Sequence, residues 1–313
     1  MNNKIKYMNI CITNRCNLAC VMCDIWKEKN KTDLPVEAVK KMLDARCLDE
    51  KLDITLTGGE LFLHKGWPQI VDAVLTKNPG WLKGISTNGT RKDDVMRFLH
   101  DFSKRLSSDF TFHISLDGIN CHDAQRGKSM GKILDTIHAI KSFNPSFGIK
   151  IKFTITAVNY TDIIPTFRFC QENDLDFRVK LAEYAENYTN RLDRQDFIFD
   201  EAARKSIIRD LLEVSREKLK LHDENAVFIA DSIRQLQGKQ REDVCMAPFQ
   251  RVFIMSEGDV FTCLHLSKIG NLLNESLDEA WVSPTAEKHR NTVTQEGCAC
   301  GVSYHGLTPS VVR

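Results

Sequence analysis

The sequence lacks the features that mark membrane, secreted and nucleic-acid-binding proteins. No apolar run approaches the roughly 20 residues that a membrane-spanning helix needs, and no small-residue cleavage site near the N-terminus marks a signal peptide. Charge of one sign is not in excess, because 43 basic residues face 42 acidic ones, so no global field favours nucleic acid or a membrane surface. The 313 residues also contain no repeat of fixed period and no low-complexity tract. We therefore expect a globular, cytoplasmic protein.

Cysteine, in contrast, is abundant, with 11 in the chain. In a chain without an export signal, these residues favour reduced thiols and metal ligands over disulfides. Three of them, Cys16, Cys20 and Cys23, have a C-x3-C-x2-C spacing shortly after an apolar run at 5–12 that predicts a strand. Soft thiolates this close together suit an iron–sulfur cluster or zinc. In a 4Fe–4S cluster, three cysteines leave one iron open to an outside ligand; a structural zinc site or an unrelated group of thiols is the alternative.

Apolar, β-rich runs alternate with amphipathic helical patterns in the first 184 residues. We predict strands at 5–12, 52–57, 82–86, 110–116, 149–157 and 177–181. We predict helices between them at 35–45, 67–75, 92–102, 131–143 and 161–173. Six strands with five intervening helices predict an α/β fold with a parallel βα series. In such a fold the chemistry collects at the C-terminal ends of the strands.

Polar and glycine-rich motifs fall at these predicted strand ends. They are Thr57-Gly58-Gly59-Glu60, Ser86-Thr87-Asn88-Gly89 and Ser115-Leu116-Asp117-Gly118. Paired glycines let a ligand approach the backbone closely, and a glutamate can accept hydrogen bonds from an ammonium group. Each motif taken alone is also compatible with a simple turn.

The cysteine loop and the strand-end motifs together resemble the radical S-adenosylmethionine (SAM) enzymes. The resemblance implies a partial (β/α)6 TIM-like barrel and a 4Fe–4S cluster held by Cys16, Cys20 and Cys23. In that family the open iron chelates the methionine end of SAM, and one-electron reduction releases a 5′-deoxyadenosyl radical that abstracts hydrogen. A reductant such as flavodoxin or ferredoxin is implied as a partner.

The same resemblance implies the SAM contacts. They are Gly58, Gly59 and Glu60 for the amino group, Ser86 and Asn88 for the methionine or ribose, Ser115 and Asp117 for the ribose, Arg126 for the carboxylate, and Asn159 and Leu181 for the adenine. An arginine fork matches a carboxylate in geometry.

No residue is assigned as a catalytic acid, base or hydrogen donor. His122 is expected to be structural, and Cys121 is an open candidate for a hydrogen-atom donor. Arg178, Lys180 and Glu183 cannot all point into the substrate cavity, because side chains alternate along a strand.

A second cysteine pattern occupies the C-terminal part of the chain. Cys245 and Cys263 form a C-x12-G-x4-C element around a predicted hairpin at 251–263, and Cys298 and Cys300 follow. The pattern resembles the twitch module, a shortened form of the SPASM extension of radical SAM enzymes, and implies one auxiliary 4Fe–4S cluster. A full SPASM module would need about three more cysteines after Cys263 for a second cluster. The closing C-x-C pair, where C-x2-C is more usual, leaves open a three-cysteine cluster with an open iron or a structural zinc.

The predicted domains are therefore the barrel at 1–184, a helical bridging segment at 185–244, and a small α+β iron–sulfur module at 245–313. The bridging segment has helical patterns at 200–221 and 225–236. We expect these helices to connect the barrel with the module; a lid over the active site is the alternative.

We expect a radical SAM oxidoreductase that dehydrogenates or epimerises a small polar substrate, such as a sugar, aminocyclitol or nucleotide derivative. In a dehydrogenation, the substrate radical would lose a proton and pass its electron to the auxiliary cluster. The main alternative is a maturase that cross-links, oxidises or epimerises a ribosomally made peptide. Since the cysteine motif begins at residue 16, we expect no peptide-recognition domain ahead of the barrel, which favours the small molecule. A non-catalytic structural metal protein is the distant alternative.

Overall fold

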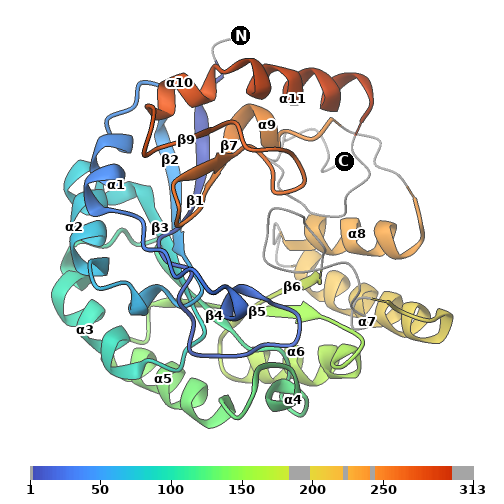
Figure 1. Cartoon of the computed structure of the whole chain (residues 1–313). Coiled ribbons are helices and arrows are strands. Elements are labelled where there is room, and N and C mark those ends of the chain that lie inside the picture. Colours follow the sequence, from blue (N-terminus) through green and yellow to red (C-terminus); the bar gives the residue numbers. More distant parts are fainter. Residues whose placement is uncertain (1–2, 183–197, 221–224, 240–243, 298–313) are drawn as a thin grey trace.

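The computed structural model describes residues 3–182, 198–220, 225–239 and 244–297. Within them, one curved sheet of nine strands runs in the order β6-β5-β4-β3-β2-β1-β7-β8-β9. The strands line the inside of a ring, and helices cover the outside (Figure 1). The fold is a partial α/β barrel with a C-terminal β-hairpin module, so the predicted fold class is confirmed.

The first six strands form the barrel wall and are all parallel to their neighbours. They are β1 (Ile5–Cys11), β2 (Leu48–Thr57), β3 (Leu82–Thr87), β4 (Thr111–Ser115), β5 (Gly148–Ile155) and β6 (Asp176–Leu181). All six predicted strands are confirmed, and the largest difference is that β2 begins four residues before the predicted 52.

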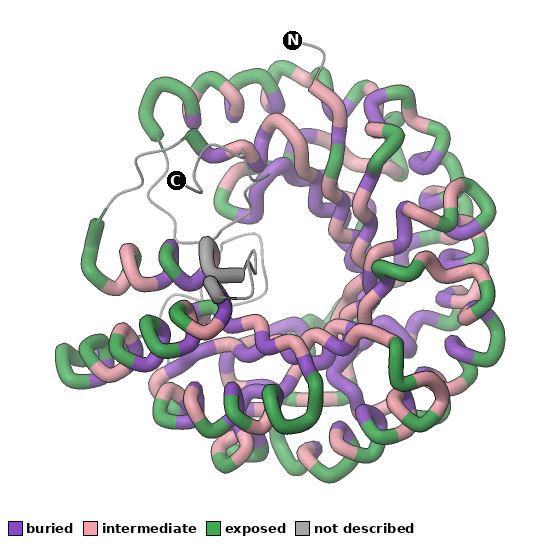
Figure 2. The backbone as a smooth tube through the Cα atoms, turned by 180° about the vertical axis from the view of Figure 1, so that it is seen from behind, coloured by how far each residue is buried: buried purple, intermediate pink, exposed green. Residues whose placement is uncertain are grey.

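Helices on the outer face alternate with these strands. They are α1 (Val36–Met42), α2 (Trp67–Lys77), α3 (Lys92–Phe102), α5 (Met130–Phe143) and α6 (Ile163–Glu172). The short α4 (His122–Arg126), which the sequence analysis did not predict, follows β4. The apolar faces of the helices turn inward against the sheet (Figure 2), so each strand buries one row of side chains under the helices.

Strand β5 shows this alternation in full. Ile149, Ile151 and Phe153 are buried in the main hydrophobic core, whereas Lys150 and Lys152 between them are only partly buried. Because successive side chains of a strand point to opposite faces, the two lysines lie on the concave face of the sheet.

The C-terminal module extends the same sheet. It comprises α9 (Ala247–Gln250), β7 (Arg251–Ile254), β8 (Asp259–Phe261), β9 (Gly270–Asn271), α10 (Leu277–Trp281) and α11 (Pro284–Gln295). The predicted hairpin is confirmed, and Gly258 at its turn has a φ of 89°, which favours glycine. The sequence analysis did not predict that β7 pairs in parallel with β1.

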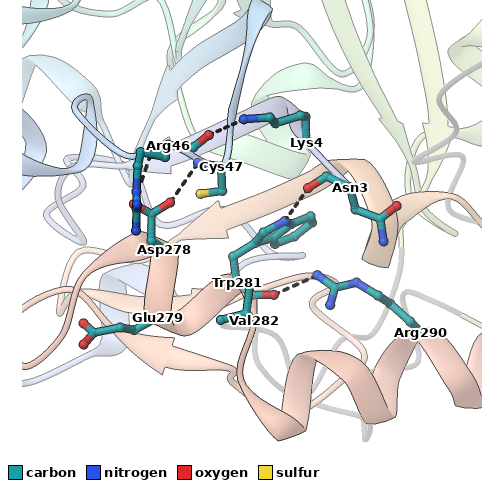
Figure 3. Close-up of a pocket in the computed structure, with 9 residues that line it drawn as sticks. All are labelled: Asn3, Lys4, Arg46, Cys47, Asp278, Glu279, Trp281, Val282 and Arg290. Atoms are coloured by element: carbon teal, nitrogen blue, oxygen red, sulfur yellow. Dashed lines mark hydrogen bonds and ion pairs between the residues drawn. The ribbon is translucent and has the colours of Figure 1, made fainter. Parts of the chain in front are cut away.

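Helix α10 fastens the module to the N-terminal edge of the barrel. The Trp281 Nε1–H donates to the carbonyl of Asn3 (2.8 Å), and the Cys47 N–H donates to Asp278 Oδ1 (2.7 Å). Arg290 donates to the carbonyl of Trp281 (2.8 Å) and lies over the Trp281 ring (Figure 3). These contacts fix the orientation of the hairpin that carries Cys263.

The two helices of the predicted bridging segment are α7 (Glu201–Lys220) and α8 (Asn225–Leu236), as expected from the sequence. They pack on each other; α7 also contacts α6, and α8 contacts β6, the edge strand of the sheet. No helix in the described ranges is long and apolar enough to cross a membrane.

Candidate functional site

The loop that carries Cys16, Cys20 and Cys23 leaves the C-terminal end of β1 and is tied to two other strand ends. The Gly59 N–H donates to the carbonyl of Thr13 (2.8 Å), and the Glu60 N–H donates to the carbonyl of Arg15 (2.7 Å). On the other side, the Val21 N–H donates to the carbonyl of Gln125 in α4 (2.9 Å). The Gly58-Gly59-Glu60 segment after β2 and helix α4 therefore hold the cysteine loop in place through its backbone.

The paired glycines are required by this contact. A Cβ atom at Gly59 would lie 2.4 Å from the carbonyl oxygen of Arg15, and one at Gly58 would lie 2.7 Å from that of Thr13. Backbone oxygens cannot move aside as the end of a side chain can. The sequence analysis assigned these glycines to the approach of a ligand, and the structure adds the approach of the cysteine loop.

The three thiols fit a cationic iron–sulfur group. Burial raises the pKa of Cys20 to about 11, and the neighbouring Cys23 and Cys16 thiols add to this effect against the opposing Arg126 guanidinium. Burial also raises the pKa of Cys16. A metal group would be needed to keep these sulfurs ionised near neutral pH. No three His, Cys, Asp or Glu side chains among the described residues surround a single-ion position. Cluster thiolates each bind a separate iron and need no such arrangement.

Glu60 is fully buried and joins the ends of β2 and β3. Its carboxylate accepts hydrogen bonds from the Asn88 N–H (2.8 Å), the Thr87 hydroxyl (2.9 Å) and the Phe62 N–H (3.3 Å). Burial raises the pKa of Glu60 to about 7, although these donors oppose the shift. The Asn88 side chain donates in turn to Asn17 Oδ1 in the cysteine loop (2.8 Å). Glu60 and Asn88 thus link the three segments, and their contacts with SAM remain predictions.

Asp117 and Arg126 form a buried ion pair at the ends of β4 and α4. The Asp117 carboxylate also accepts the Thr154 N–H (2.7 Å). Burial opposes the charge of Arg126, but the adjacent Asp117 more than offsets this effect and raises the pKa of Arg126. Arg126 Nη1 also lies 3.8 Å from Cys20 Sγ. The pair thus holds the Arg126 guanidinium beside the cysteine loop; its predicted contacts with the ribose and carboxylate of SAM remain predictions.

The remaining predicted SAM contacts lie around the same edge. Asn159 is fully buried, donates to the carbonyls of Asp117 (2.9 Å) and Thr154 (3.0 Å), and so fixes the β4–β5 edge. Ser86 Oγ lies 3.5 Å from His113 Nδ1. Ser115 ends β4, and Leu181 is buried at the end of β6. Their proposed contacts with SAM remain predictions.

Sequence analysis missed two polar residues that support this edge. Gln125 donates to the carbonyl of Thr154 (2.9 Å), while its own carbonyl holds the cysteine loop. Asp162 accepts the N–H groups of Asn120 (2.6 Å) and Cys121 (2.8 Å). Neither residue belongs to a strand-end motif, so no local pattern identified them.

The structure gives His122 a structural environment, as expected. Its Nδ1 accepts the Asp117 N–H (3.1 Å), its Nε2 lies 2.9 Å from Ser129 Oγ, and burial lowers its pKa to about 4. Cys121 is partly buried beside Asp162, and burial raises its pKa.

Two of the auxiliary cysteines, Cys245 and Cys263, lie in the described part of the C-terminal module. Cys245 precedes α9, and Cys263 follows β8; both are buried. The His265 N–H lies 3.5 Å from Cys263 Sγ and donates to it, a contact that stabilises a thiolate ligand. Arg251 at the start of β7 pairs with Tyr7, four residues before the end of β1. Leu264, which follows Cys263, packs in one apolar cluster with Cys11 at the end of β1. Cys298 and Cys300 lie outside the described residues.

Two family models match the chain. The one described as the radical SAM superfamily matches residues 10–170. The SPASM model, described as an iron-sulfur cluster-binding domain, matches residues 245–301.

Curated relatives match at low identity. The antilisterial bacteriocin subtilosin biosynthesis protein AlbA of Bacillus subtilis is 24% identical over 291 residues, which cover 88% of this chain and 59% of AlbA. A GTP 3′,8-cyclase of Aliarcobacter butzleri is 23% identical over 300 residues, covering 88% of this chain and 87% of the cyclase. The uncharacterized protein MJ0907 of Methanocaldococcus jannaschii is 30% identical over 171 residues, covering 52% of this chain and 58% of that protein. The chain thus spans about three fifths of the length of AlbA and of MJ0907.

A solved structure with the same arrangement is SuiB of Streptococcus suis bound to S-adenosylmethionine. It superposes with a TM-score of 0.68 at 18% identity, covering 92% of this chain and 68% of SuiB. SuiB bound to its precursor peptide SuiA superposes with a TM-score of 0.66, covering 92% of this chain and 67% of SuiB.

Proposed function

The chain belongs to the radical SAM superfamily and carries a C-terminal SPASM iron–sulfur domain, and on that premise we propose that it modifies a ribosomally made peptide. It is a radical SAM enzyme whose cofactors are the radical SAM 4Fe–4S cluster, SAM and the auxiliary iron–sulfur clusters of the SPASM domain. When bound, the first cluster and SAM supply hydrogen-atom abstraction from an unactivated C–H bond. The modification of the peptide would be a cross-link, an oxidation or an epimerisation.

The observation that carries the peptide proposal is the breadth of the similarity to proteins that handle peptides. AlbA is named for the biosynthesis of a bacteriocin, and its alignment covers 88% of this chain. SuiB, which was crystallised with a precursor peptide, superposes on 92% of it. Coverage this wide takes in most of the barrel and most of the C-terminal module. The likeness to SuiB itself concerns the fold, and the peptide is a property of SuiB that supports the proposal.

Within this proposal the chain's own residues have separate tasks. Cys16, Cys20 and Cys23 would hold the cluster that binds SAM, and Asp117 would hold the Arg126 guanidinium beside it. The auxiliary site would be held by Cys245, Cys263, Cys298 and Cys300. We place the substrate on the concave face of the sheet, between the two cysteine sites.

A second candidate is a small polar substrate, which the sequence analysis favoured. It is supported by the GTP 3′,8-cyclase of Aliarcobacter butzleri, because that alignment covers nearly all of both chains. We rank it second because the SPASM match and the peptide-handling proteins together favour a peptide. The position of the cysteine motif near residue 16 gives no argument for the small molecule.

The test uses the anaerobically reconstituted enzyme with SAM and dithionite. One arm offers short peptides encoded beside its gene; the other offers GTP. The proposal expects 5′-deoxyadenosine in both arms. It also expects that only a peptide loses hydrogens or takes up solvent deuterium, as measured by mass spectrometry. A changed GTP with unchanged peptides would establish the second candidate. No deoxyadenosine and no iron would reject both.

A further inference from the structure

Helix α4 contacts the cysteine loop between two of its cysteines. The Gln125 carbonyl accepts the Val21 N–H (2.9 Å), and Val21 lies between Cys20 and Cys23. The next residue of the helix, Arg126, places Nη1 at 3.8 Å from Cys20 Sγ. A change in the orientation of α4 would therefore move both contacts at once.

The helix depends on other segments for its orientation. It has only five residues, His122–Arg126, whereas isolated helices shorter than about 12 residues are marginal in water. Its first turn is held by the Asp162 carboxylate, which accepts the Cys121 N–H (2.8 Å). Its last turn is held by the ion pair of Arg126 and by the side chain of Gln125, which is fully buried.

The Gln125 side chain bonds to the end of β5 at two points. Its Nε2 donates to the carbonyl of Thr154 (2.9 Å), and its Oε1 accepts the Thr156 hydroxyl (2.5 Å). Asn159 bonds to the same two residues. The Asn159 Nδ2 donates to the carbonyl of Thr154 (3.0 Å), and its Oδ1 accepts the Thr156 N–H (2.8 Å). Gln125 and Asn159 thus share both partners, so the position of one side chain constrains the other.

These contacts form a continuous path from the end of β5 to the cysteine loop. At one end lies Asn159, the predicted contact of the SAM adenine. At the other end lies Val21, between two cysteines that would hold the cluster to which the methionine end of SAM binds. One SAM molecule has to fit both ends, and a misplacement of about 1 Å can lower a rate by two orders of magnitude. The distance between the two ends therefore has to be fixed by the protein.

We propose that Gln125 is a positioning residue for SAM binding and cleavage. Its side chain holds α4 against the end of β5, so that the part of the loop around Cys20 and Cys23 keeps its place relative to Asn159. Gln125 acts through the Val21 N–H and through Thr154 and Thr156. The inference goes beyond the proposed function, because it concerns SAM and holds for a peptide and for a small substrate alike.

The substitution Gln125→Met tests the role of the side chain with little change to the fold. Methionine is unbranched and has a helix propensity similar to that of glutamine, but it can make neither hydrogen bond. The Thr154 carbonyl keeps the Asn159 amide, and the Thr156 hydroxyl lies 3.3 Å from Asn159 Oδ1. Gln125→Leu removes the same two bonds with a side chain of another shape. An effect shared by both variants therefore comes from the lost hydrogen bonds.

The first measurement is hydrogen–deuterium exchange of the reconstituted enzyme without SAM, resolved to single residues by mass spectrometry. In both variants we expect the Val21 N–H to exchange at least about tenfold faster, because this part of the loop opens more often. The Gly59 N–H, which bonds to the start of the loop from the end of β2, should keep its rate. Ser283→Ala is the control variant. It removes the N-cap of α11, which accepts the Ala286 N–H (3.2 Å), and should leave Val21 exchange unchanged.

The second measurement is the dissociation constant of SAM, obtained by following the electron paramagnetic resonance signal of the reduced cluster during titration. We expect SAM to bind about two- to tenfold more weakly to both Gln125 variants, the effect of one lost hydrogen bond. Their iron content should equal that of the wild type. This result would separate a misplaced loop from a lost cluster.

Unchanged Val21 exchange in both Gln125 variants, or equal acceleration in Ser283→Ala, overturns the inference. Faster Val21 exchange with an unchanged dissociation constant for SAM also overturns it, because the place of the loop would then not matter to SAM. Loss of iron in both variants would show that Gln125 retains the cluster and does not position it. None of these measurements uses a peptide, so the inference can fail while the proposed function stands.

Discussion

The cysteine loop after β1 and the C-terminal module present thiols in two different ways. Cys16, Cys20 and Cys23 lie in one loop whose backbone is held by the ends of β2 and by α4. Cys245 and Cys263 lie on either side of the β7–β8 hairpin and are buried, and Cys245 packs against Ala247 and Val293. The first site is held by polar contacts between segments that are distant in the chain, and the second by the β7–β8 hairpin and its apolar packing against the end of β1.

The difference shows what each site needs from the rest of the chain. Two buried carboxylates lie beside the first loop. Glu60 accepts the Asn88 N–H after β3, and Asp117 accepts the Thr154 N–H of β5, so each joins two segments of the barrel. Loss of one of them should disturb several segments at once. The second site depends on the hairpin and on α10, which fastens the module to the barrel. Changes there should remain local, and the predictions below test that contrast.

The largest expected effect is at the first site. The triple variant Cys16→Ala/Cys20→Ala/Cys23→Ala should abolish SAM cleavage, because no other group of thiols among the described residues lies in this loop to bind the cluster. Release of 5′-deoxyadenosine under dithionite is the measurement. Cys170→Ala is the matched control, since Cys170 is buried in the main core and belongs to neither cysteine pattern. Full activity of the triple variant would refute the assignment of the cluster.

The second prediction removes the auxiliary site and leaves the first intact. Cys263→Ala should lower the iron content by about four per chain, the content of one cubane cluster, and leave deoxyadenosine release in place. Formation of modified product should fall by at least about tenfold, which corresponds to 1.4 kcal/mol in the barrier. Cys298→Ala and Cys300→Ala should have the same effect. Unchanged product formation in all three would show that these cysteines take no part in the reaction.

The contrast also explains what the sequence could reveal. The C-x3-C-x2-C motif and the six strands are local patterns, so spacing and alternation predicted them. The C-terminal hairpin was predicted for the same reason. Its parallel pairing with β1 was not, because Tyr7 and Arg251 are far apart in the chain and no pattern in either strand specifies the other.

The supporting polar residues were missed for a related reason. Gln125 and Asp162 act through backbone groups of other segments, and such contacts leave no signature in their own neighbourhood. Lys150 and Lys152 did have a signal, since they alternate with apolar residues in a predicted strand. Alternation places them on one face, but only the register with β6 shows that Lys150 lies opposite Asp176 and Lys152 opposite Arg178.

The third prediction concerns stability at the first site. Asp117→Asn leaves the buried Arg126 without its counter-charge, and breaking a buried pair in this way costs about 3–5 kcal/mol. The free energy of unfolding, measured by urea titration, should fall by that amount. Glu37→Gln is the control, because it breaks the exposed Lys40–Glu37 pair and should cost at most about 1 kcal/mol. Equal effects of the two substitutions would contradict the role given to the Asp117–Arg126 pair.

The smallest effect compares one buried histidine from each region. His122 near the first site bonds to Asp117 and Ser129, and His289 in the module lies between Thr262 and Ser267. Burial lowers the pKa of both, that of His122 to about 4, where the added charge of Arg126 contributes. An unfolded histidine binds its proton near pH 6.5, so between these values the unfolded state binds more protons than the folded state.

The stability from His122 is therefore fully present above about pH 6.5 and is lost as the pH falls toward 4, by about 3 kcal/mol in total. His122→Asn keeps a hydrogen-bond acceptor near the Asp117 N–H but removes the titration. The variant should lose less stability than the wild type between about pH 7 and pH 4 in urea titrations. His289→Asn should change the pH dependence of the free energy of unfolding less, because burial lowers the pKa of His289 less than that of His122. If the two variants flatten it equally, the Arg126 charge beside His122 adds no more to the lowering of its pKa than Arg290 and Lys288 add to that of His289. The charged groups around the cysteine loop would then contribute no more to the acid sensitivity of the fold than those of the module do.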